Sequence, residues 1–263
     1  MTLSFHVRHE VTFERAKEVL FAIGRGESYD HVLQADRQIT RLRQLRLLSG
    51  DSLTSNGENI FSLCETKQDL WSDLLHFSHY TLWQPENSSE NGFAWTYRTF
   101  VDHIWCLNHI QINVEGLEPV VSKLINDIEA ENEFDVEETR KAVVSLSWRS
   151  LKGVSNWLAG VIPPVIENEH FTRRFFCPPE LALLSAGWTA QQTDGEIGID
   201  FLLTPERREM MCKVCLLDPS ALDRVLDWTL PLYPEVMVDG TNAGVYGRFI
   251  RFLKWPELSD LLH

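Results

Sequence analysis

Apolar residues recur every three to four positions along most of the chain before Pro163, and this period constrains the fold more than any other feature. A helix with this spacing gathers its apolar side chains on one face and buries that face against its neighbours. After Pro163 the helical period alternates with short stretches such as "EIGIDFLLT", which have the two-residue period of a strand. The pattern therefore predicts a mainly α protein with a small α+β C-terminal portion.

The first helix is predicted from "TFERAKEVLFAIGRG", residues 12–26. Thr12 suits the N-cap position, and Gly24 and Gly26 suit a helix end. Its inward positions are Phe13, Ala16, Val19, Leu20 and Ile23. A second, short helix is predicted in "SYDHVLQ", residues 28–34.

A third helix is predicted in "DRQITRLRQLRLLSG", residues 36–50, where four arginines stand against one aspartate. Its apolar stripe consists of Ile39, Leu42, Leu45 and Leu47/Leu48. The spacing of Arg37, Arg41 and Gln44 predicts that one face presents them together. Arg43 and Arg46 share a neighbouring face, and Gly50 is expected to end the helix.

Asn56-Gly57 is a strong turn signal between Leu53 and Ile60, so a short hairpin is expected after the arginine helix. Three helices followed by a hairpin are typical of a winged helix-turn-helix, in which the third helix enters the major groove of DNA. We therefore predict that Arg37, Arg41, Gln44 and Arg46 contact duplex DNA, with Asn56 at the wing tip. A solvated arginine face, an intramolecular salt-bridge surface and a protein-binding winged helix remain alternatives.

The net charge of -14 and the isoelectric point near 5.1 limit where DNA can bind. An acidic surface repels polyanions, so such a contact has to be confined to a local basic patch. No stretch approaches the roughly 20 apolar residues of a membrane helix, and no basic segment followed by an apolar run marks a leader. Five scattered cysteines favour reduced thiols. We expect a cytoplasmic protein without a membrane contact.

The middle of the chain, from residue 67 to 130, is rich in aromatic residues and histidine. "QDLWSDLLHFSHYTLW" and "AWTYRTFVDHIWCLNHI" are expected to form amphipathic helices of an aromatic core. His76 and His79 have a spacing that a metal site could use, but no acidic or cysteine partner lies at a diagnostic interval.

A second helix-turn-helix is predicted from "VEETRKAVVSL", residues 136–146, followed by "SWRSLKGVSNWLAGV", residues 147–161. On the later helix the outward positions are predicted to be Arg149, Lys152, Ser155 and Asn156. Arg149, Lys152 and Asn156 suit contacts to phosphates or bases, so they form a second candidate DNA surface.

The remaining chain is expected to carry a helix after Pro178-Pro179, a strand in "EIGIDFLLT", a capped helix in "DPSALDRVLDWTLPLYP" and a final strand after a turn in "VDGTNAGVYGRFIRFL". "PERREMMCKVCLLD" suits a helix or a strand. The predicted domains are 1–66 (winged helix), 67–190 (helical, with the second helix-turn-helix) and 191–263 (small α+β).

Catalytic signatures are weak. Cys212 and Cys215 have the spacing of half a zinc site or a redox pair, but the other cysteines are isolated and no strand precedes the pair. The glycines of "GTNAGVYG" match neither a dinucleotide fingerprint nor a P-loop. A nuclease that holds a divalent metal with scattered carboxylates would have to use Asp194, Glu196, Asp200 and Asp239, which flank candidate strands. We expect no cofactor and no bound metal.

The order of "ITRLRQLRLLSGDSLTSNG", "DLWSDLLHFSHYTLW", "AWTYRTFVDHIW", "SWRSLKGVSNWL" and "FTRRFFCPPELALLSAG" resembles an uncharacterised prokaryotic winged-helix family encoded beside genes of DNA-modification and phage-defence systems. The resemblance covers about the first 190 residues. It implies a DNA-binding, non-catalytic accessory or regulatory protein of a bacterial defence system. The alternatives are an acidic adaptor that binds other proteins of a defence complex and, third, a metal-dependent nuclease.

Overall fold

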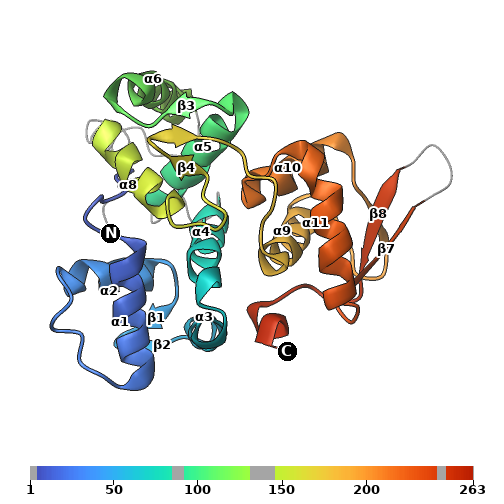
Figure 1. Cartoon of the computed structure of the whole chain (residues 1–263), viewed down its shortest axis with the longest axis horizontal. Helices are drawn as coiled ribbons and strands as arrows, with labels where there is room; N and C mark the ends of the chain where they lie inside the picture. Colours follow the sequence, from blue (N-terminus) through green and yellow to red (C-terminus); the bar gives the residue numbers. More distant parts are fainter. Residues whose placement is uncertain (1–4, 85–91, 131–145, 242–246, 263) are drawn as a thin grey trace. The chain divides into compact units, whose positions relative to one another are not determined.

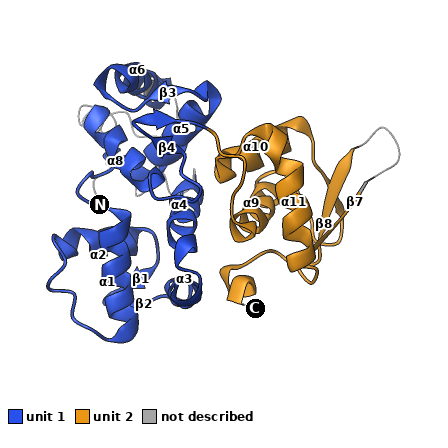
Figure 2. Ribbon diagram, viewed as in Figure 1, with its two compact units in different colours: residues 1–172 blue, residues 173–263 orange. Residues whose placement is uncertain are grey.

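The computed structural model describes residues 5–84, 92–130, 146–241 and 247–262. It is mainly helical with small antiparallel sheets (Figure 1). The chain divides into two compact units, residues 1–172 and 173–263 (Figure 2). The predicted boundaries at 66 and 190 are therefore not those of the structure. Residue 190 lies inside a helix that packs within the second unit.

Unit 1 contains, in chain order, α1 (Phe13–Arg25), α2 (Ala35–Gln44), β1 (Leu48–Ser49), β2 (Ser52–Leu53), α3 (Ser55–Thr66), α4 (Trp71–Thr81), α5 (Gly92–Leu107), β3 (Ile110–Gln111), α6 (Val114–Ala130), α8 (Trp148–Leu158), β4 (Ile166–Glu167) and β5 (His170–Phe171). Helix α1 packs on α2 and α3, whereas α4 packs on α5 and α8. The last three strands form a sheet in the order β3-β5-β4.

Helix α1 confirms the prediction for the start of the chain. The Thr12 hydroxyl accepts a hydrogen bond from the Arg15 amide, and Gly26 ends the helix with φ 68°. A left-handed residue at this position lets its amide reach the last carbonyls of the helix, and glycine adopts it without steric cost.

The wing predicted at Asn56-Gly57 is wrong. Asn56 lies in the first turn of α3, where the Thr54 hydroxyl caps the helix by accepting from the Gly57 amide at 3.1 Å. Gly57 is a close-approach glycine, because a Cβ there would lie 2.1 Å from the Leu47 carbonyl oxygen. The observed hairpin lies earlier in the chain than expected: Leu48 pairs with Leu53, and Gly50, with φ 59°, lies in the turn.

Residues 28–34 do not form the predicted short helix; the segment is irregular, with turns from residue 30 onward. The arginine helix ends at Gln44 instead of Gly50. The order is therefore helix, helix, hairpin, helix, with the hairpin directly after α2. Over residues 5–66, which the structure describes without a gap, two helices and not three precede the hairpin, so the predicted winged-helix order is not present in this form.

The aromatic core of unit 1 follows the prediction. Helices α4 and α5 bury most of their aromatic side chains, and the largest fully buried ones in the unit are Trp71, Trp95, Trp157, Tyr80 and Tyr97. His76 and His79 also lie inside, where His76 Nδ1 and the Tyr97 hydroxyl are hydrogen-bonded at 3.0 Å. Both histidines are thus packed among aromatic rings.

Unit 2 contains α9 (Pro179–Gln192), β6 (Asp200–Leu202), α10 (Pro205–Cys215), α11 (Leu222–Thr229), the 3-10 turn η4 (Leu230–Leu232), β7 (Met237–Thr241) and β8 (Arg248–Phe252). Helix α9 is buried along most of its length and packs against α10 and α11. The strands form an antiparallel sheet in the order β6-β8-β7. The helix after Pro178-Pro179 and the strand in 196–204 confirm predictions, but β7 occupies a segment expected to be a turn.

Candidate functional site

The outer face of α2 carries two arginines that are only loosely held. Arg37 Nη1 donates to Glu10 Oε1 at 2.7 Å, and Arg43 donates to the Gly50 carbonyl and to Asp51 Oδ1, both at 2.8 Å. The Asp51 side chain is 78% exposed. Exposed ion pairs of this kind contribute about 0–1 kcal/mol. Arg43 therefore loses little when its carboxylate partner is replaced by another anion.

Gln44 and Arg46 also lie on this side of unit 1. Gln44 is the half-buried last residue of α2, and Arg46 is exposed just beyond the helix, with φ 59°. Arg46 is thus not on the helix itself, as predicted, but at its junction with the hairpin. We call the set Arg37, Thr40, Arg43, Gln44 and Arg46, together with the Gly50-Asp51 turn, the α2–hairpin face.

Arg41 does not belong to this face, and its predicted contact with DNA is wrong. Its side chain is buried among the residues of unit 1, with 4% exposure, and its guanidinium lies 3.9 Å from the centroid of the Phe93 ring. A spacing of four aligns Arg37 with Arg41 along the helix, but helix α2 turns the Arg41 side chain toward α5. Arg41 is therefore an interior cation.

Buried Arg41 is incompletely satisfied. Its Nε and Nη1 have no hydrogen-bond partner among the described residues. Burial, and secondarily the charge of Arg8, lowers the pKa of Arg41 to about 9, so the side chain is still protonated at neutral pH. Burying an ion costs several kcal/mol, whereas a cation–π contact returns about 2 kcal/mol. The contact with Phe93 alone does not offset this burial.

Two further unpartnered polar atoms lie beyond Phe93. The His79 ring is 6.4 Å from Phe93 and 4.5 Å from the Trp157 ring, centroid to centroid. Because His79 Nδ1 bonds the Leu75 carbonyl, Nδ1 carries the proton and the neutral ring presents Nε2 as an acceptor. Neither His79 Nε2 nor Trp157 Nε1 has a partner in the described part of the chain. Burial, and next the charge of Arg41, lowers the pKa of His79 well below 6.5.

On α8, Arg149 is exposed and Lys152 and Asn156 are half-buried, as the outward positions of that helix predict. Ser155, also expected outside, is buried with 3% exposure and donates to the Leu151 carbonyl. Lys152 Nζ lies 3.8 Å from Glu169 Oε1. The preceding helix of the predicted pair, in 136–146, falls almost wholly outside the described residues, so the structure does not test the second helix-turn-helix.

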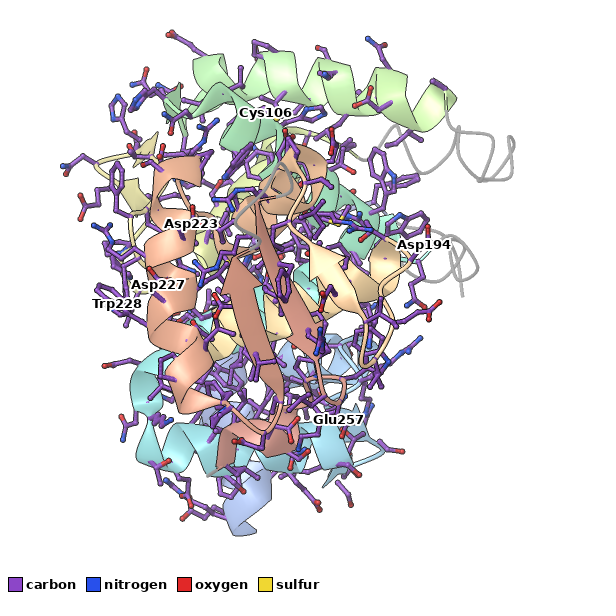
Figure 3. The ribbon with its side chains drawn as sticks, turned by 90° about the vertical axis from the view of Figure 1, so that its right-hand side faces the viewer. Cys106, Asp194, Asp223, Asp227, Trp228 and Glu257 are labelled. Carbon is purple, nitrogen blue, oxygen red and sulfur yellow. The ribbon has the colours of Figure 1, made fainter. Side chains whose placement is uncertain are left out.

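The carboxylates considered for a metal site do not gather. Asp200 pairs with Arg251 at 2.6 Å and Asp239 with Arg248 at 2.5 Å, so both sit in ion pairs. Asp194 and Glu196 are exposed, and Figure 3 places Asp194 far from the aspartates of α11. The described residues hold no group of three histidine, cysteine or acidic side chains that could bind a metal ion.

Cys212 and Cys215 both lie inside unit 2, near the end of α10. Burial raises the pKa of the Cys212 thiol to about 12, so it is protonated at neutral pH. A protonated thiol is a poor nucleophile and a poor zinc ligand.

Unit 2 presents an apolar patch on and beside α11. Trp228 is 50% exposed, and Phe175 and Leu232 are each 58% exposed. The Trp228 ring lies 5.6 Å from that of Phe176. We call Phe175, Phe176, Trp228 and Leu232 the α11 patch.

Carboxylates flank the α11 patch, and Figure 3 shows Asp223 and Asp227 along the same side of α11 as Trp228. The Asp227 side chain is 66% exposed, whereas Arg248, which bonds Asp227 at 2.9 Å, is 11% exposed. Hydrogen bonds from Arg208 lower the pKa of Asp223 below its ordinary value, although burial opposes this shift, and the charges of Arg208 and Arg248 lower the pKa further. Arg224 is exposed as well, bonds the Phe175 carbonyl and lies 5.9 Å from the centroid of the Trp228 ring, so the rim carries both carboxylates and a guanidinium.

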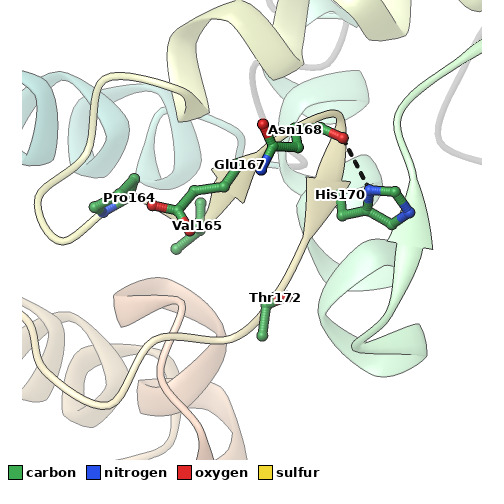
Figure 4. A pocket seen from close by; sticks show the side chains of 6 residues that line it. All are labelled: Pro164, Val165, Glu167, Asn168, His170 and Thr172. Carbon is green, nitrogen blue, oxygen red and sulfur yellow. Dashed lines mark hydrogen bonds between the residues drawn. The ribbon is translucent and has the colours of Figure 1, made fainter.

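A pocket of unit 1 lies against the β4–β5 hairpin (Figure 4). It is lined by Pro164, Val165, Glu167, Asn168, His170 and Thr172. His170 Nδ1 is already bonded to the Asn168 carbonyl at 2.9 Å, and Glu167, Asn168 and His170 are exposed. These side chains are solvated and offer no preorganised catalytic group.

Within the described ranges, none of the helices combines the length and the apolar character needed to cross a membrane. No family model, no curated protein and no solved structure matches this chain.

Proposed function

We propose that this chain is a non-catalytic accessory protein that binds duplex DNA through the α2–hairpin face. Helix α2 acts as the recognition helix, and the Gly50-Asp51 turn acts as the wing tip in place of Asn56. The single observation that supports this most is the bonding of Arg43. Its guanidinium joins the outer face of α2 to the turn of the hairpin through Gly50 and Asp51.

The chemistry of the α2–hairpin face suits a phosphate backbone. Arg43 and Arg46 are exposed cations, and Thr40 and Gln44 add a hydroxyl and an amide between them. Side chains of these types make most of the contacts to phosphate oxygens in protein–DNA interfaces. Since the pairing of Arg43 with Asp51 is exposed and weak, a phosphate can replace the carboxylate. The resemblance of the sequence to a family encoded beside DNA-modification and phage-defence genes agrees with this role, which also implies a cytoplasmic location.

The net charge of -14 limits the strength of this binding. Few phosphates are neutralised, so the affinity should fall only moderately with salt, with a slope of about -0.9 in log K against log salt for each phosphate contact.

The test is fluorescence anisotropy of a labelled duplex across salt concentrations. An Arg43→Ala/Arg46→Ala variant should bind more weakly, and its slope should be shallower by about 0.9 for each phosphate that the missing guanidinium groups no longer neutralise. The control variant is Arg25→Ala/Arg251→Ala. It removes the same charge from two other exposed arginines, which pair with Glu65 and Asp200. Equally weakened binding in both variants would show that Arg43 and Arg46 form a solvated face and not a DNA-binding surface.

A second candidate function, a protein–protein adaptor, is favoured by the α11 patch. Exposed tryptophan and phenylalanine are typical interface anchors, and a rim with charges of both signs suits a partner surface of complementary charge pattern. A photo-crosslinking residue at position 228 should capture a defined protein in cells that express the neighbouring genes. The same residue at position 253, where Leu253 is 47% exposed, should not. Identical capture at both positions would count against an adaptor.

A further inference from the structure

The interior of unit 1 holds donors and an acceptor that none of the residues described in the structure satisfies. Arg41 contributes Nε–H and Nη1–H, Trp157 contributes Nε1–H, and His79 contributes the acceptor Nε2. All three residues are at least nine-tenths buried. Buried polar atoms without partners are rare in folded proteins, and each one calls for a partner that completes the site.

These groups belong to one aromatic cluster. The Phe93 ring contacts the Arg41 guanidinium and lies next to the His79 ring, which in turn lies against Trp157 and stacks on Tyr97 at 4.7 Å. The charge of Arg41 also acts on both His79 and His6. Helices α2, α4, α5 and α8 thus bring the groups together from four separate parts of the chain.

Together, the donors of Arg41 and Trp157 and the acceptor of His79, which lack partners in the described part of the chain, define the chemistry that a ligand must have. A buried guanidinium that bonds no carboxylate of the described residues calls for an anion, and the indole N–H adds another donor for an anion oxygen. A neutral imidazole acceptor repels a fully deprotonated anion but accepts a hydrogen bond from an O–H. An oxyanion that carries both charged oxygens and one O–H offers the acceptors and the donor that these three residues lack.

We propose that the interior of unit 1 binds a hydrogen phosphate group, held by Arg41 and Trp157 and oriented by the acceptor Nε2 of His79. The simplest such ligand is inorganic phosphate, and a phosphate monoester has the same chemistry. This site is separate from the α2–hairpin face, because Arg41 points inward from the helix whose outer side carries Arg37 and Arg43.

The experiment measures the melting temperature of the full chain against phosphate and against sulfate at matched ionic strength. Sulfate has the shape of phosphate but carries no O–H at neutral pH, and both ions stabilise proteins generally by exclusion from the surface. Phosphate should raise the melting temperature of the wild type in a saturable way, and sulfate should not. Equal effects of the two ions would overturn the proposal.

Arg41→Met removes the charge and keeps an unbranched stem, so the difference between phosphate and sulfate should disappear. Arg37→Met is the matched control on the same helix and should keep the full response. If Arg41→Met does not fold, Trp157→Phe replaces it, because it keeps a ring and removes one donor. Phosphate affinity, measured by isothermal titration with one site per chain, should then fall roughly tenfold, as for one hydrogen bond to a charged group. Unchanged affinity in Trp157→Phe, or an absent response in Arg37→Met, would contradict the assignment.

A carboxylate of the chain itself is the competing counterion. Glu86 and Glu90 precede Phe93 in the sequence and lie outside the described residues. If Glu86→Gln or Glu90→Gln lowers the melting temperature and phosphate has no saturable effect on the wild type, the counterion is internal and the proposal fails. The same phosphate response in Arg43→Ala/Arg46→Ala and in the wild type would separate this site from DNA binding.

Discussion

Gly153 should control how firmly the N-terminal segment is attached to α8. A Cβ at this position would lie 2.2 Å from the Val7 carbonyl oxygen, well inside van der Waals contact. Val7 cannot simply retreat, because its side chain and those of Phe5 and Val11 are buried, with 0–1% exposure. A Gly153→Ala variant must therefore displace a fully packed segment.

The magnitude follows from two opposing effects. Alanine stabilises a helix interior by about 1 kcal/mol relative to glycine. Forcing an extra carbon into a packed interior costs about 1–3 kcal/mol, and a contact with backbone lies at the upper end of this range. We expect a net destabilisation of about 1–2 kcal/mol. For a unit of 172 residues, this corresponds to a fall in melting temperature of about 2–8 °C.

The assay is thermal unfolding followed by circular dichroism. Asn156→Ala, at a half-buried position on the same helix, is the control and should stay within about 0.5 kcal/mol of the wild type. If Gly153→Ala melts at or above the wild-type temperature, the close approach of Val7 to α8 does not hold in solution.

Three further outcomes are expected. Burial lowers the pKa of His79, so the wild type is fully stabilised above pH 6.5 and loses stability as the pH falls below that value. His79→Phe should therefore show a weaker pH dependence of the free energy of unfolding, measured by urea titration at several pH values. A variant that loses stability as steeply as the wild type would place His79 in a solvated site. Thr54→Ala removes the cap of α3 and should lower stability by about 1 kcal/mol, measured by urea unfolding, whereas Ser52→Ala on the exposed hairpin should not. Of the five thiols, that of Cys106 is exposed and the other four are buried. A thiol reagent should therefore modify one group rapidly in the native protein and none in Cys106→Ser. Rapid reaction of Cys212 would contradict its burial.

Local signals predicted the elements whose ends are set locally. Thr12 and Gly26 bound α1 because a hydroxyl cap and a left-handed glycine act within one turn of the helix. The same kind of signal predicts the wrong element at Asn56-Gly57. There the Thr54 hydroxyl caps a helix in place of the predicted turn. Position 57 needs glycine because the Leu47 carbonyl, ten positions earlier in the chain, lies too close for a Cβ. A contact between residues this far apart in sequence cannot be predicted from the residues next to Gly57.

Arg41 illustrates the limit for the candidate site. Periodicity placed Ile39 and Leu42 correctly in the core, but Arg41 lies at the edge of the same buried sector. Whether a residue at that edge faces water depends on the helix packed against it, here α5 with Phe93. The unpartnered atoms of His79 and Trp157 could not be predicted, since they arise from packing among α4, α5 and α8.

The attachment of the N-terminal segment to α8 also bears on how the chain is made. Phe5 packs edge-on against Trp95, and His6 bonds Ser150 across 144 positions of sequence, so the segment completes its native contacts only once the intervening residues have been synthesised. At about 5–20 residues per second, this interval lasts roughly 7–30 s. An apolar stretch that waits so long is a natural binding site for a ribosome-associated chaperone, and unit 1 can complete its fold only after α8 has emerged.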